Sequence, residues 1–340
     1  MLTANISGVE HAYELIDNRS EAVVAEAPST GAPTLVFVHG WLLSRAYWKP
    51  LIEQISTRYR CLTYDLRGFG DSITPSALSQ PELDQPELGQ PALGQPTEQP
   101  QPPLELPIEL PKDRICLLEK EILHTEYNPS AYSLAAYAHD LNSLLKTLNI
   151  EQAWVLGHSL GGSIALWAAY LYPKRVAGVF CVNAGGGIYI AKEFEKFRAA
   201  GQQMVKFRPA WLQRIPGLPR IFSRIMVKQP LQIRWGQQRL ADFIRANRQA
   251  AEGALLETTT EAEVHLLPQV MGYIQQPVHF ITATEDSIMP PRYVRYLASF
   301  HPHFRAGESV TELSNCGHMS MVEQPKAVAE VIQTVMRRAR

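Results

Sequence analysis

Residues 153–170 read AWVLGHSLGGSIALWAAY. The apolar residues 153–156 predict a buried strand, residues 163–170 predict a helix, and the pentapeptide 157–161, Gly-His-Ser-Leu-Gly, lies between them. Glycines on both sides of Ser159 would let strand and helix approach closely around a sharp turn that strains the serine backbone. The Ser159 hydroxyl would then lie in solvent at the positive end of the helix dipole. The stretch therefore predicts a nucleophilic serine at a strand–turn–helix elbow.

A nucleophilic serine needs a histidine as base and an acid that orients it, and two later stretches supply them. Here they follow in the chain order Ser, acid, His. Residues 277–283 (PVHFITA) predict a buried strand, and Asp286 lies in the turn after it. Residues 310–313 (VTEL) predict the last strand, and His318 follows it. We expect His318 to be the base and Asp286 to orient it, with the neighbouring Glu285 as the alternative acid.

An oxyanion hole is expected between the elbow and an early strand. Residues 34–38 (TLVFV) predict that strand, which ends at a His-Gly-Trp tripeptide. At an elbow of this type the oxyanion is bound by a backbone N–H after such a strand and by the N–H of the residue after the nucleophile. We therefore expect the backbone N–H groups of Trp41 and Leu160 to serve as donors. Three further residues flank the site and are expected to support it: His39, Gly40 and His158. We expect the two histidines to do so by hydrogen bonds to loop backbone.

Four short motifs that are typical of a known protein family follow one another along the chain. They are His39-Gly40-Trp41, residues 65–72 (DLRGFGDS), residues 157–162 (GHSLGG), and Gly317-His318 followed by residues 322–325 (VEQP). From about residue 32 to the C-terminus the chain thereby resembles the α/β-hydrolase superfamily. Within it, the chain is similar to a lid-bearing group of cyanobacteria and chloroplasts whose relatives include esterases that dephytylate chlorophyll pigments.

The resemblance implies an α/β fold, with a mainly parallel central sheet flanked by helices and a helical lid insertion. It also implies a place at an internal membrane, the thylakoid. Some relatives carry their catalytic acid at the position of Asn183, which cannot serve as an acid. This difference favours Asp286 for that role.

The remaining stretches alternate between strand and helix patterns, which independently favours a parallel sheet. Helical spacing runs over residues 46–58, and a strand follows over residues 60–64. Ser133 is the expected N-cap of a helix that runs to Leu148. Another strand covers residues 176–182, and we expect one earlier strand within the first 25 residues.

The hydrolase core is expected in residues 1–187 and 269–340, and the lid in residues 188–268. Residues 75–111 interrupt the core with a degenerate Gln-Pro-Glu-Leu repeat. Recurrent proline prevents a helix, and the polar remainder cannot bury enough apolar surface to offset the ordering entropy. A disordered surface excursion is expected, either a repeat expansion tolerated in a loop or a docking segment.

The expected lid carries a strong positive charge. Between Lys192 and Arg248 thirteen basic residues stand against three acidic ones, a net charge of +10, so the rest of the chain carries −11. Apolar and aromatic residues are interleaved with these charges. Two interpretations follow: the aromatics line the pocket beneath a solvated basic face, or the lid lies on an anionic membrane surface, where each basic residue contributes about 1 kcal/mol.

The composition is that of a globular enzyme, with 46% hydrophobic and 19% charged residues among 340. A net charge of −1 argues against a nucleic-acid partner. No segment approaches the roughly 20 apolar residues of a spanning helix, and the N-terminus lacks the features of a secretory signal. Four widely spaced cysteines predict no disulfide framework and favour a reducing, cytoplasmic location. Peripheral contact with an internal membrane is a further expectation. The four cysteines are Cys61, Cys116, Cys181 and Cys316.

These features predict a serine hydrolase without cofactor or metal that cleaves a lipophilic carboxylic ester through an acyl-enzyme. A serine at the elbow excludes the dehalogenase and epoxide-hydrolase mechanisms, which need a carboxylate nucleophile there. Thioesterase, amidase, C–C hydrolase and cofactor-free haloperoxidase activities stay open, because the triad leaves the choice of substrate to the lid. The alternative from another class is a ligand receptor or scaffold with a vestigial triad.

Overall fold

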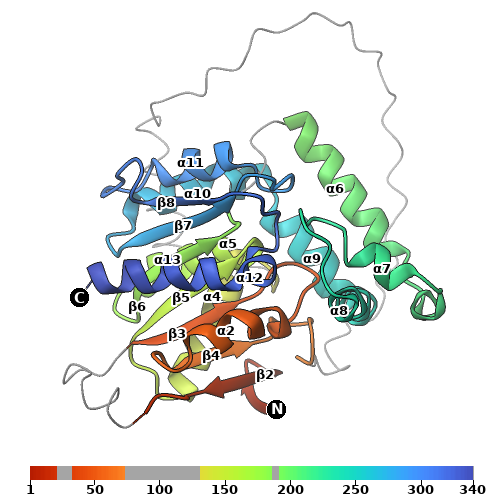
Figure 1. The fold of residues 1–340 in the computed structure, drawn as a ribbon, viewed down its shortest axis with the longest axis horizontal. Helices are drawn as coiled ribbons and strands as arrows, with labels where there is room; N and C mark the ends of the chain where they lie inside the picture. The colour runs from red at the N-terminus through yellow and green to blue at the C-terminus, as the bar shows by residue number, and fades with distance from the viewer. Residues whose placement is uncertain (21–32, 73–130, 186–190, 340) are drawn as a thin grey trace, which may run out of the picture. The chain divides into compact units, whose positions relative to one another are not determined.

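The computed structural model describes residues 1–20, 33–72, 131–185 and 191–339. These residues form one sheet with the strand order β1-β2-β4-β3-β5-β6-β7-β8 (Figure 1). Strands β3 to β8 run parallel, and β2 is antiparallel to both of its neighbours, which confirms the predicted mainly parallel α/β sheet. The strands are β1 (Leu2–Ile6), β2 (Val9–Ile16), β3 (Thr34–Val38), β4 (Cys61–Tyr64), β5 (Ala153–His158), β6 (Val176–Val182), β7 (Val278–Ala283) and β8 (Val310–Leu313).

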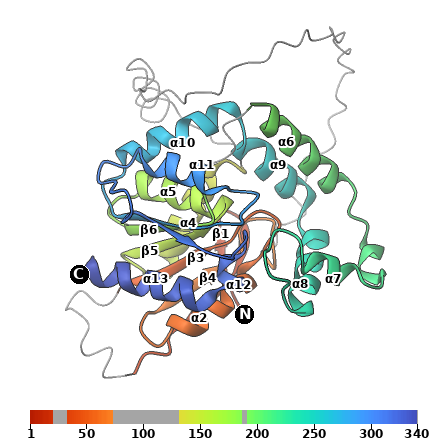
Figure 2. The ribbon, with the colours of Figure 1, turned by 45° about the horizontal axis from the view of Figure 1, so that its top comes forward.

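Helices cover both faces of the sheet (Figures 1 and 2). One face carries α2 (Lys49–Ile55), α12 (Ser320–Glu323) and α13 (Pro325–Arg338). The other face carries α4 (Leu134–Thr147), α5 (Leu160–Leu171), α10 (Glu261–Tyr273) and α11 (Pro291–Ala298). The parallel strands are therefore buried on both sides, which is why they read in the sequence as continuous apolar runs.

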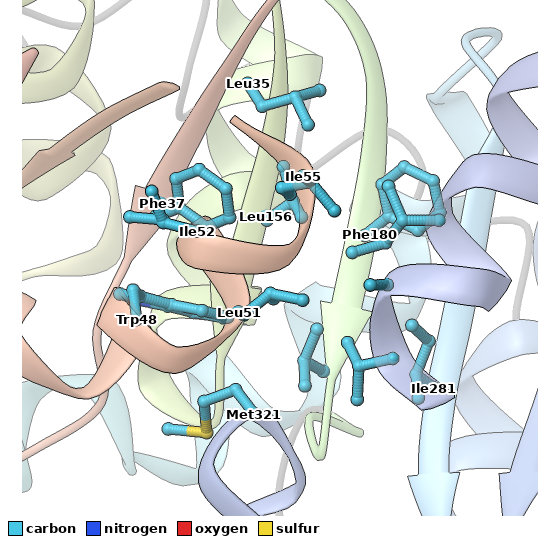
Figure 3. Close-up of a cluster of buried hydrophobic side chains, with 14 of the residues drawn as sticks. Leu35, Phe37, Trp48, Leu51, Ile52, Ile55, Leu156, Phe180, Ile281 and Met321 are labelled. Atoms are coloured by element: carbon cyan, nitrogen blue, oxygen red, sulfur yellow. The ribbon is translucent and has the colours of Figure 1, made fainter. Parts of the chain in front are cut away.

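A core of aliphatic and aromatic side chains lies between the sheet and the helices on the α2 side (Figure 3). The sheet contributes Leu35, Phe37, Leu156, Phe180 and Ile281. The 3-10 helix η1 (Arg45–Trp48), α2 and α12 contribute Trp48, Leu51, Ile52, Ile55 and Met321. Full burial of a side chain of this size stabilises the fold by about 1.5–3 kcal/mol. This packing fixes the strands whose carboxyl ends carry the predicted site.

Two elements differ from the sequence prediction. The helix expected over residues 46–58 is a 3-10 turn followed by α2, which begins at Lys49 and ends at Ile55. Pro50 explains this start, because proline has no N–H to donate and suits the first turn of a helix. The N-terminal region holds two strands where one was expected. They form a hairpin through Ser7 and Gly8, both with positive φ (51° and 80°), the conformation that two-residue hairpin turns favour.

Between β6 and β7 the described residues form six helical segments, and we call the first five of them the insertion (residues 191–258). They are α6 (Ala191–Lys206), η3 (Ala210–Arg214), α7 (Leu218–Phe222), α8 (Ile233–Arg245) and α9 (Arg248–Thr258). Helix α10 follows and packs against α5; Pro268, where the expected lid ends, lies inside it. The expected excursion over residues 75–111, Cys116 and residues 188–190 lie outside the described residues. None of the described helices combines the length and the apolar character that crossing a bilayer requires.

Candidate active site

Ser159 occupies the elbow between β5 and α5. Its backbone has φ 51° and ψ −118°, a conformation that costs a residue with a side chain on the order of 1–3 kcal/mol. The Ser159 N–H donates to the carbonyl oxygen of Val182 in β6 at 3.1 Å, and the Ser159 carbonyl accepts from the N–H of Gly162 at 2.9 Å. The strained residue is therefore held by backbone bonds to a neighbouring strand and to the first turn of α5.

Two glycines make this elbow possible. A Cβ atom on Gly157 would lie 2.0 Å from the carbonyl oxygen of Gly161, and one on Gly161 would lie 2.2 Å from that of Val38 in β3. Both distances are far below van der Waals contact, so no larger residue fits without a backbone shift. The close approach also places the start of α5 against the end of β3, next to the His-Gly-Trp tripeptide.

His318 and Asp286 meet in the loops that follow β8 and β7. His318 Nδ1 lies 2.8 Å from Asp286 Oδ2 and 3.0 Å from Oδ1, and both residues are buried. Burial alone would raise the pKa of Asp286, but His318, the Met289 N–H and Asn183 together hold that pKa below its usual value. In a neutral imidazole, a hydrogen bond from Nδ1–H to the ionised carboxylate favours the tautomer whose Nε2 carries no proton and can act as a base.

His158 links His318 to the elbow. The two imidazole rings lie 4.8 Å apart between centroids, and His158 Nε2 donates to the His318 carbonyl oxygen at 2.8 Å. Burial, with the neighbouring His318 and His39, lowers the pKa of His158 to about 3, so this ring is neutral at neutral pH. The residue directly before Ser159 thus supports the loop that carries His318.

His39 and Gly40 support the loop after β3. His39 Nδ1 donates to the Gly40 carbonyl oxygen at 2.8 Å, and its Nε2 accepts from the Leu66 N–H at 2.9 Å. Burial lowers the pKa of His39, which keeps the ring neutral for this pair of bonds. A Cβ atom on Gly40 would lie 2.8 Å from His158 Nδ1, so glycine provides the room for the His158 ring.

The predicted oxyanion donors lie at the same edge of the sheet. Leu160 is the first residue of α5, and Trp41 follows β3 in the loop that α5 approaches. The Trp41 indole Nε1–H donates to the Ala251 carbonyl oxygen of α9 at 2.8 Å. This bond fastens the loop that carries one predicted donor to the insertion.

Asn183 holds the acid in place, a role that the sequence analysis did not assign to it. It follows β6 with φ 48°, and its Nδ2 donates to Asp286 Oδ2 at 3.0 Å and to the Gly317 carbonyl oxygen at 3.2 Å. Its Oδ1 accepts from the hydroxyl of Ser320. A polar residue directly after a buried apolar strand was the available signal, but its partners lie more than 100 residues away in the chain.

Glu323 is a second residue of the candidate site whose position the sequence did not predict. Its carboxylate accepts from the backbone N–H groups on either side of His318, those of Gly317 (3.1 Å) and Met319 (3.2 Å). It also accepts from the N–H of Lys228 in the insertion at 2.8 Å. The N–H of His318 itself donates to the Met226 carbonyl oxygen at 2.9 Å. The insertion is therefore joined directly to the loop of the predicted base.

Two residues were alternative candidates for catalytic roles, Glu285 as the acid and Cys316 as a nucleophile, and neither is bonded to His318 as Asp286 is. Glu285 is exposed, and its carboxylate lies 3.5 Å from Lys228 Nζ, whereas Asp286 is the acid bonded to His318. Burial raises the pKa of the Cys316 thiol to about 12, so it stays protonated and unreactive. Within the described part of the chain, no three His, Cys, Asp or Glu side chains gather as they would around a metal ion.

The turn after β4 forms an ion-pair network beside the site. The buried Asp65 accepts from the backbone N–H groups of Arg45 (2.6 Å) and Asp71 (2.7 Å), and it pairs with the Arg45 guanidinium. Arg67 binds Asp140 of α4 through both carboxylate oxygens. The network braces the loops after β3 and β4 against each other.

Comparisons with known proteins agree with this architecture. An uncharacterized protein of Mycobacterium tuberculosis is 28% identical over 217 residues, which are 60% of this chain and 62% of that protein. The chain thus spans about three fifths of the length of this relative. The 3-oxoadipate enol-lactonase 2 of Acinetobacter baylyi is 25% identical over 306 residues, which are 90% of this chain and 89% of that protein.

Among solved structures, a thermophilic esterase from Thermogutta terrifontis superposes with a TM-score of 0.65 at 18% identity, covering 99% of this chain and 97% of that one. This likeness supports the fold. The protein family described as alpha/beta hydrolase fold matches residues 33–325, which contain all four sequence motifs. This chain therefore belongs to the alpha/beta hydrolase fold family.

Proposed function

We propose that the protein is a serine hydrolase that cleaves carboxylic esters without a cofactor. The observation that carries this proposal is the buried hydrogen bond between His318 and Asp286, at the same sheet edge as the strained Ser159. A nucleophile, a base and an orienting acid on the ends of three strands are the parts that acyl transfer needs. The family and its esterase neighbour support ester hydrolysis at the general level.

The reaction would proceed in two acyl transfers. Ser159 Oγ attacks the ester carbonyl carbon while His318 Nε2 takes the hydroxyl proton, and the Trp41 and Leu160 N–H groups bind the oxyanion. The C–O bond of the ester then breaks, and His318 gives its proton to the leaving alcohol. Water, deprotonated by His318, attacks the acyl carbonyl carbon. The bond to Ser159 Oγ then breaks, His318 returns the proton to Oγ, and the carboxylic acid leaves. Asp286 stabilises the imidazolium cation in both steps.

We propose a lipophilic ester as the substrate. The insertion joins the His318 loop and presents large apolar side chains, among them Phe207 and Trp211. The curated relative from Acinetobacter is named for an enol-lactone, a cyclic ester, which supports the ester bond but not the lipophilic part. Phytylated pigments belong to the proposed substrate class through the dephytylating esterases that the motifs resemble.

A fluorophosphonate probe tests the nucleophile, because it reacts with activated serines and leaves ordinary ones unlabelled. We expect labelling of the wild-type protein, its loss in Ser159→Ala, and its retention in Ser163→Ala, a matched serine four residues along in the same helix region. A folded wild-type protein that never labels would instead support the receptor or scaffold alternative.

Substrate class is tested by kcat/KM on p-nitrophenyl esters of graded acyl length beside phytylated pigments. We expect kcat/KM to rise with acyl length, because each buried CH2 group contributes about 0.8 kcal/mol. A preference for acetate over long acyl chains would refute the lipophilic substrate while leaving the esterase mechanism intact.

A further inference from the structure

We propose that the outer end of the insertion, residues 206–225, docks on the surface of an anionic lipid bilayer. We call this segment the basic tip. The inference rests on the proposed function in one respect, that a lipophilic ester would be reached from a membrane. Its structural basis is separate and lies in exposure, charge and the order of the side chains.

The basic tip is exposed to an unusual degree for a segment of two helices. Neither η3 nor α7 contributes a buried residue. Phe207, Trp211 and Ile221 have 67%, 53% and 57% of their surface exposed, and Ile215 and Ile225 are exposed as well. Soluble monomers rarely expose several large apolar side chains together, and such patches mark interaction surfaces.

The charge of the region has a single sign. Residues 196–241 contain ten basic residues and no acidic one. Some of these cations have structural tasks: Arg239 donates to the Phe222 and Ile225 carbonyl oxygens, and Arg208 donates to those of Val205 and Phe243. Four others are exposed and pair with no carboxylate of the described residues: Lys206, Arg214, Arg220 and Arg224.

Each of these four cations directly precedes an exposed apolar residue. The pairs are Lys206-Phe207, Arg214-Ile215, Arg220-Ile221 and Arg224-Ile225. Alternation of this kind suits the boundary of a bilayer, where apolar side chains enter the acyl region and long cationic side chains reach back to the phosphates. A solvated basic face accounts for the cations but not for their apolar neighbours.

A surface cavity beside α7 could bind one lipid headgroup. Its volume is about 300 Å³, and its lining residues are Arg220, Ser223, Arg224, Pro230, Leu231 and Ile233. Two of the lining residues are arginines, which favours a phosphate, because arginine binds phosphate oxygens through paired N–H donors. Ile233, half exposed, supplies an apolar wall for the adjoining lipid.

Charge favours a bilayer over a second copy of this chain. Two basic tips that faced each other would bring like charges together, whereas an anionic leaflet attracts every exposed cation of the tip. The tip also leads directly to the candidate site. Ile225 precedes Met226, whose carbonyl oxygen accepts the hydrogen bond from the His318 N–H. Docking would therefore bring lipid next to the loop that carries the proposed base.

Vesicle flotation of the full chain tests this docking. The Ser159→Ala variant is used throughout, so that the outcome depends on binding alone and stays separate from the fate of the proposed activity. We expect flotation with vesicles that contain about 30% phosphatidylserine in phosphatidylcholine and none with phosphatidylcholine alone, because the attraction is electrostatic. Raising the salt from about 0.1 M to about 1 M should release the protein, since it shortens the screening length from about 10 Å to about 3 Å.

Two charge-matched double variants locate the surface. Arg214→Glu with Arg220→Glu should weaken vesicle affinity at least about 30-fold, since each lost cation accounts for about a fivefold change. Lys174→Glu with Lys326→Glu, exposed lysines outside the insertion, changes the net charge equally and should leave affinity within about twofold. Trp211→Ala should weaken binding about tenfold and remove the blue shift of tryptophan fluorescence on vesicle addition.

Three results would overturn the proposal. The first is absence of flotation with anionic vesicles at low salt. The second is equal loss of affinity in the two double variants, which would make the effect one of net charge. The third is a dimer in sedimentation velocity without lipid that Trp211→Ala dissociates, which would identify the tip as a surface for self-association.

Discussion

Two carboxylates hold His318 from different sides, and each controls a different property of it. Asp286 accepts from the imidazole Nδ1 and thereby sets the tautomer. Glu323 accepts from the backbone N–H groups of Gly317 and Met319 and thereby sets the position of the loop. If His318 is the base, as proposed, losing the tautomer with an unprotonated Nε2 would abolish its basic function, while displacing its loop would leave a base in a poorer position. The two residues should therefore show different kinetic signatures when they are replaced.

Asp286→Asn keeps the size of the side chain but offers an N–H to His318, which stabilises the wrong tautomer. We expect kcat to fall about 10⁴-fold, with an unchanged fold by circular dichroism. Glu285→Gln, the adjacent and exposed carboxylate, is the matched control and should retain wild-type kcat within about twofold. A reversal of these two effects would make Glu285 the acid.

Glu323→Gln should lower kcat about tenfold to 100-fold with little change in KM, because a shift of about 1 Å in a catalytic group has effects of this size. The amide keeps the shape of the side chain but replaces one accepting oxygen by a donor that faces backbone N–H groups. Steady-state kinetics on a soluble ester measures the split between kcat and KM. Glu330→Gln, exposed on α13, is the control, and an equal effect there would remove Glu323 from the positioning role.

At the scale of elements, the elbow depends on the distance between β5 and α5. Gly157→Ala would place a methyl group 2.0 Å from the Gly161 carbonyl oxygen, so either the strand or the helix must move. We expect a loss of about 3 kcal/mol or more of unfolding free energy, and loss of activity, because displaced backbone at a packed junction has few alternatives. Urea denaturation measures the first effect and ester hydrolysis the second.

Gly272→Ala in α10 is the matched control for the elbow. Its new Cβ would lie 3.6 Å from the Phe300 carbonyl oxygen, an ordinary contact. Alanine is the better helix former by about 1 kcal/mol, so this variant should be as stable as the wild type or slightly more so. Equal destabilisation by both substitutions would show that the elbow does not need its glycine.

Local pattern predicted the elements well where burial or capping decides them. Strand β6 runs over residues 176–182 as expected, and Ser133 Oγ accepts from the Ala136 N–H at 3.1 Å as the cap of α4. The apolar spacing was a poor guide where a local backbone preference competes with it. Proline favours the first turn of a helix, and α2 begins at Lys49, beside Pro50, later than the spacing indicated. The contacts of Asn183 and Glu323 could not be read from sequence, because their partners come together only after β6, β7 and β8 have paired.

At the scale of the whole molecule, two buried carboxyl groups make stability depend on pH in opposite directions. The pKa of Asp286 is lowered in the fold, so its stabilisation is present above the unfolded pKa of about 3.9 and is lost as the pH falls below that value. Asp242 of α8 behaves in the opposite sense. Burial raises its pKa to about 6, although Ser44 and Gln238 donate hydrogen bonds to it at 2.9 Å and 3.0 Å.

The folded state therefore binds the Asp242 proton more tightly than the unfolded state does. Between about pH 4 and about pH 6 this group makes the unfolding free energy fall as the pH rises, by up to about 3 kcal/mol for a shift of about two pKa units. Asp242→Asn removes this titration. The unfolding free energy of the variant minus that of the wild type should therefore be about 1–3 kcal/mol larger at pH 7.5 than at pH 4.5. Urea denaturation at the two pH values measures this difference, with Glu308→Gln, an exposed carboxylate, as the control. If the stability difference between Asp242→Asn and the wild type is the same at both pH values, Asp242 does not change its protonation between them, which would contradict a pKa of about 6 in the folded state.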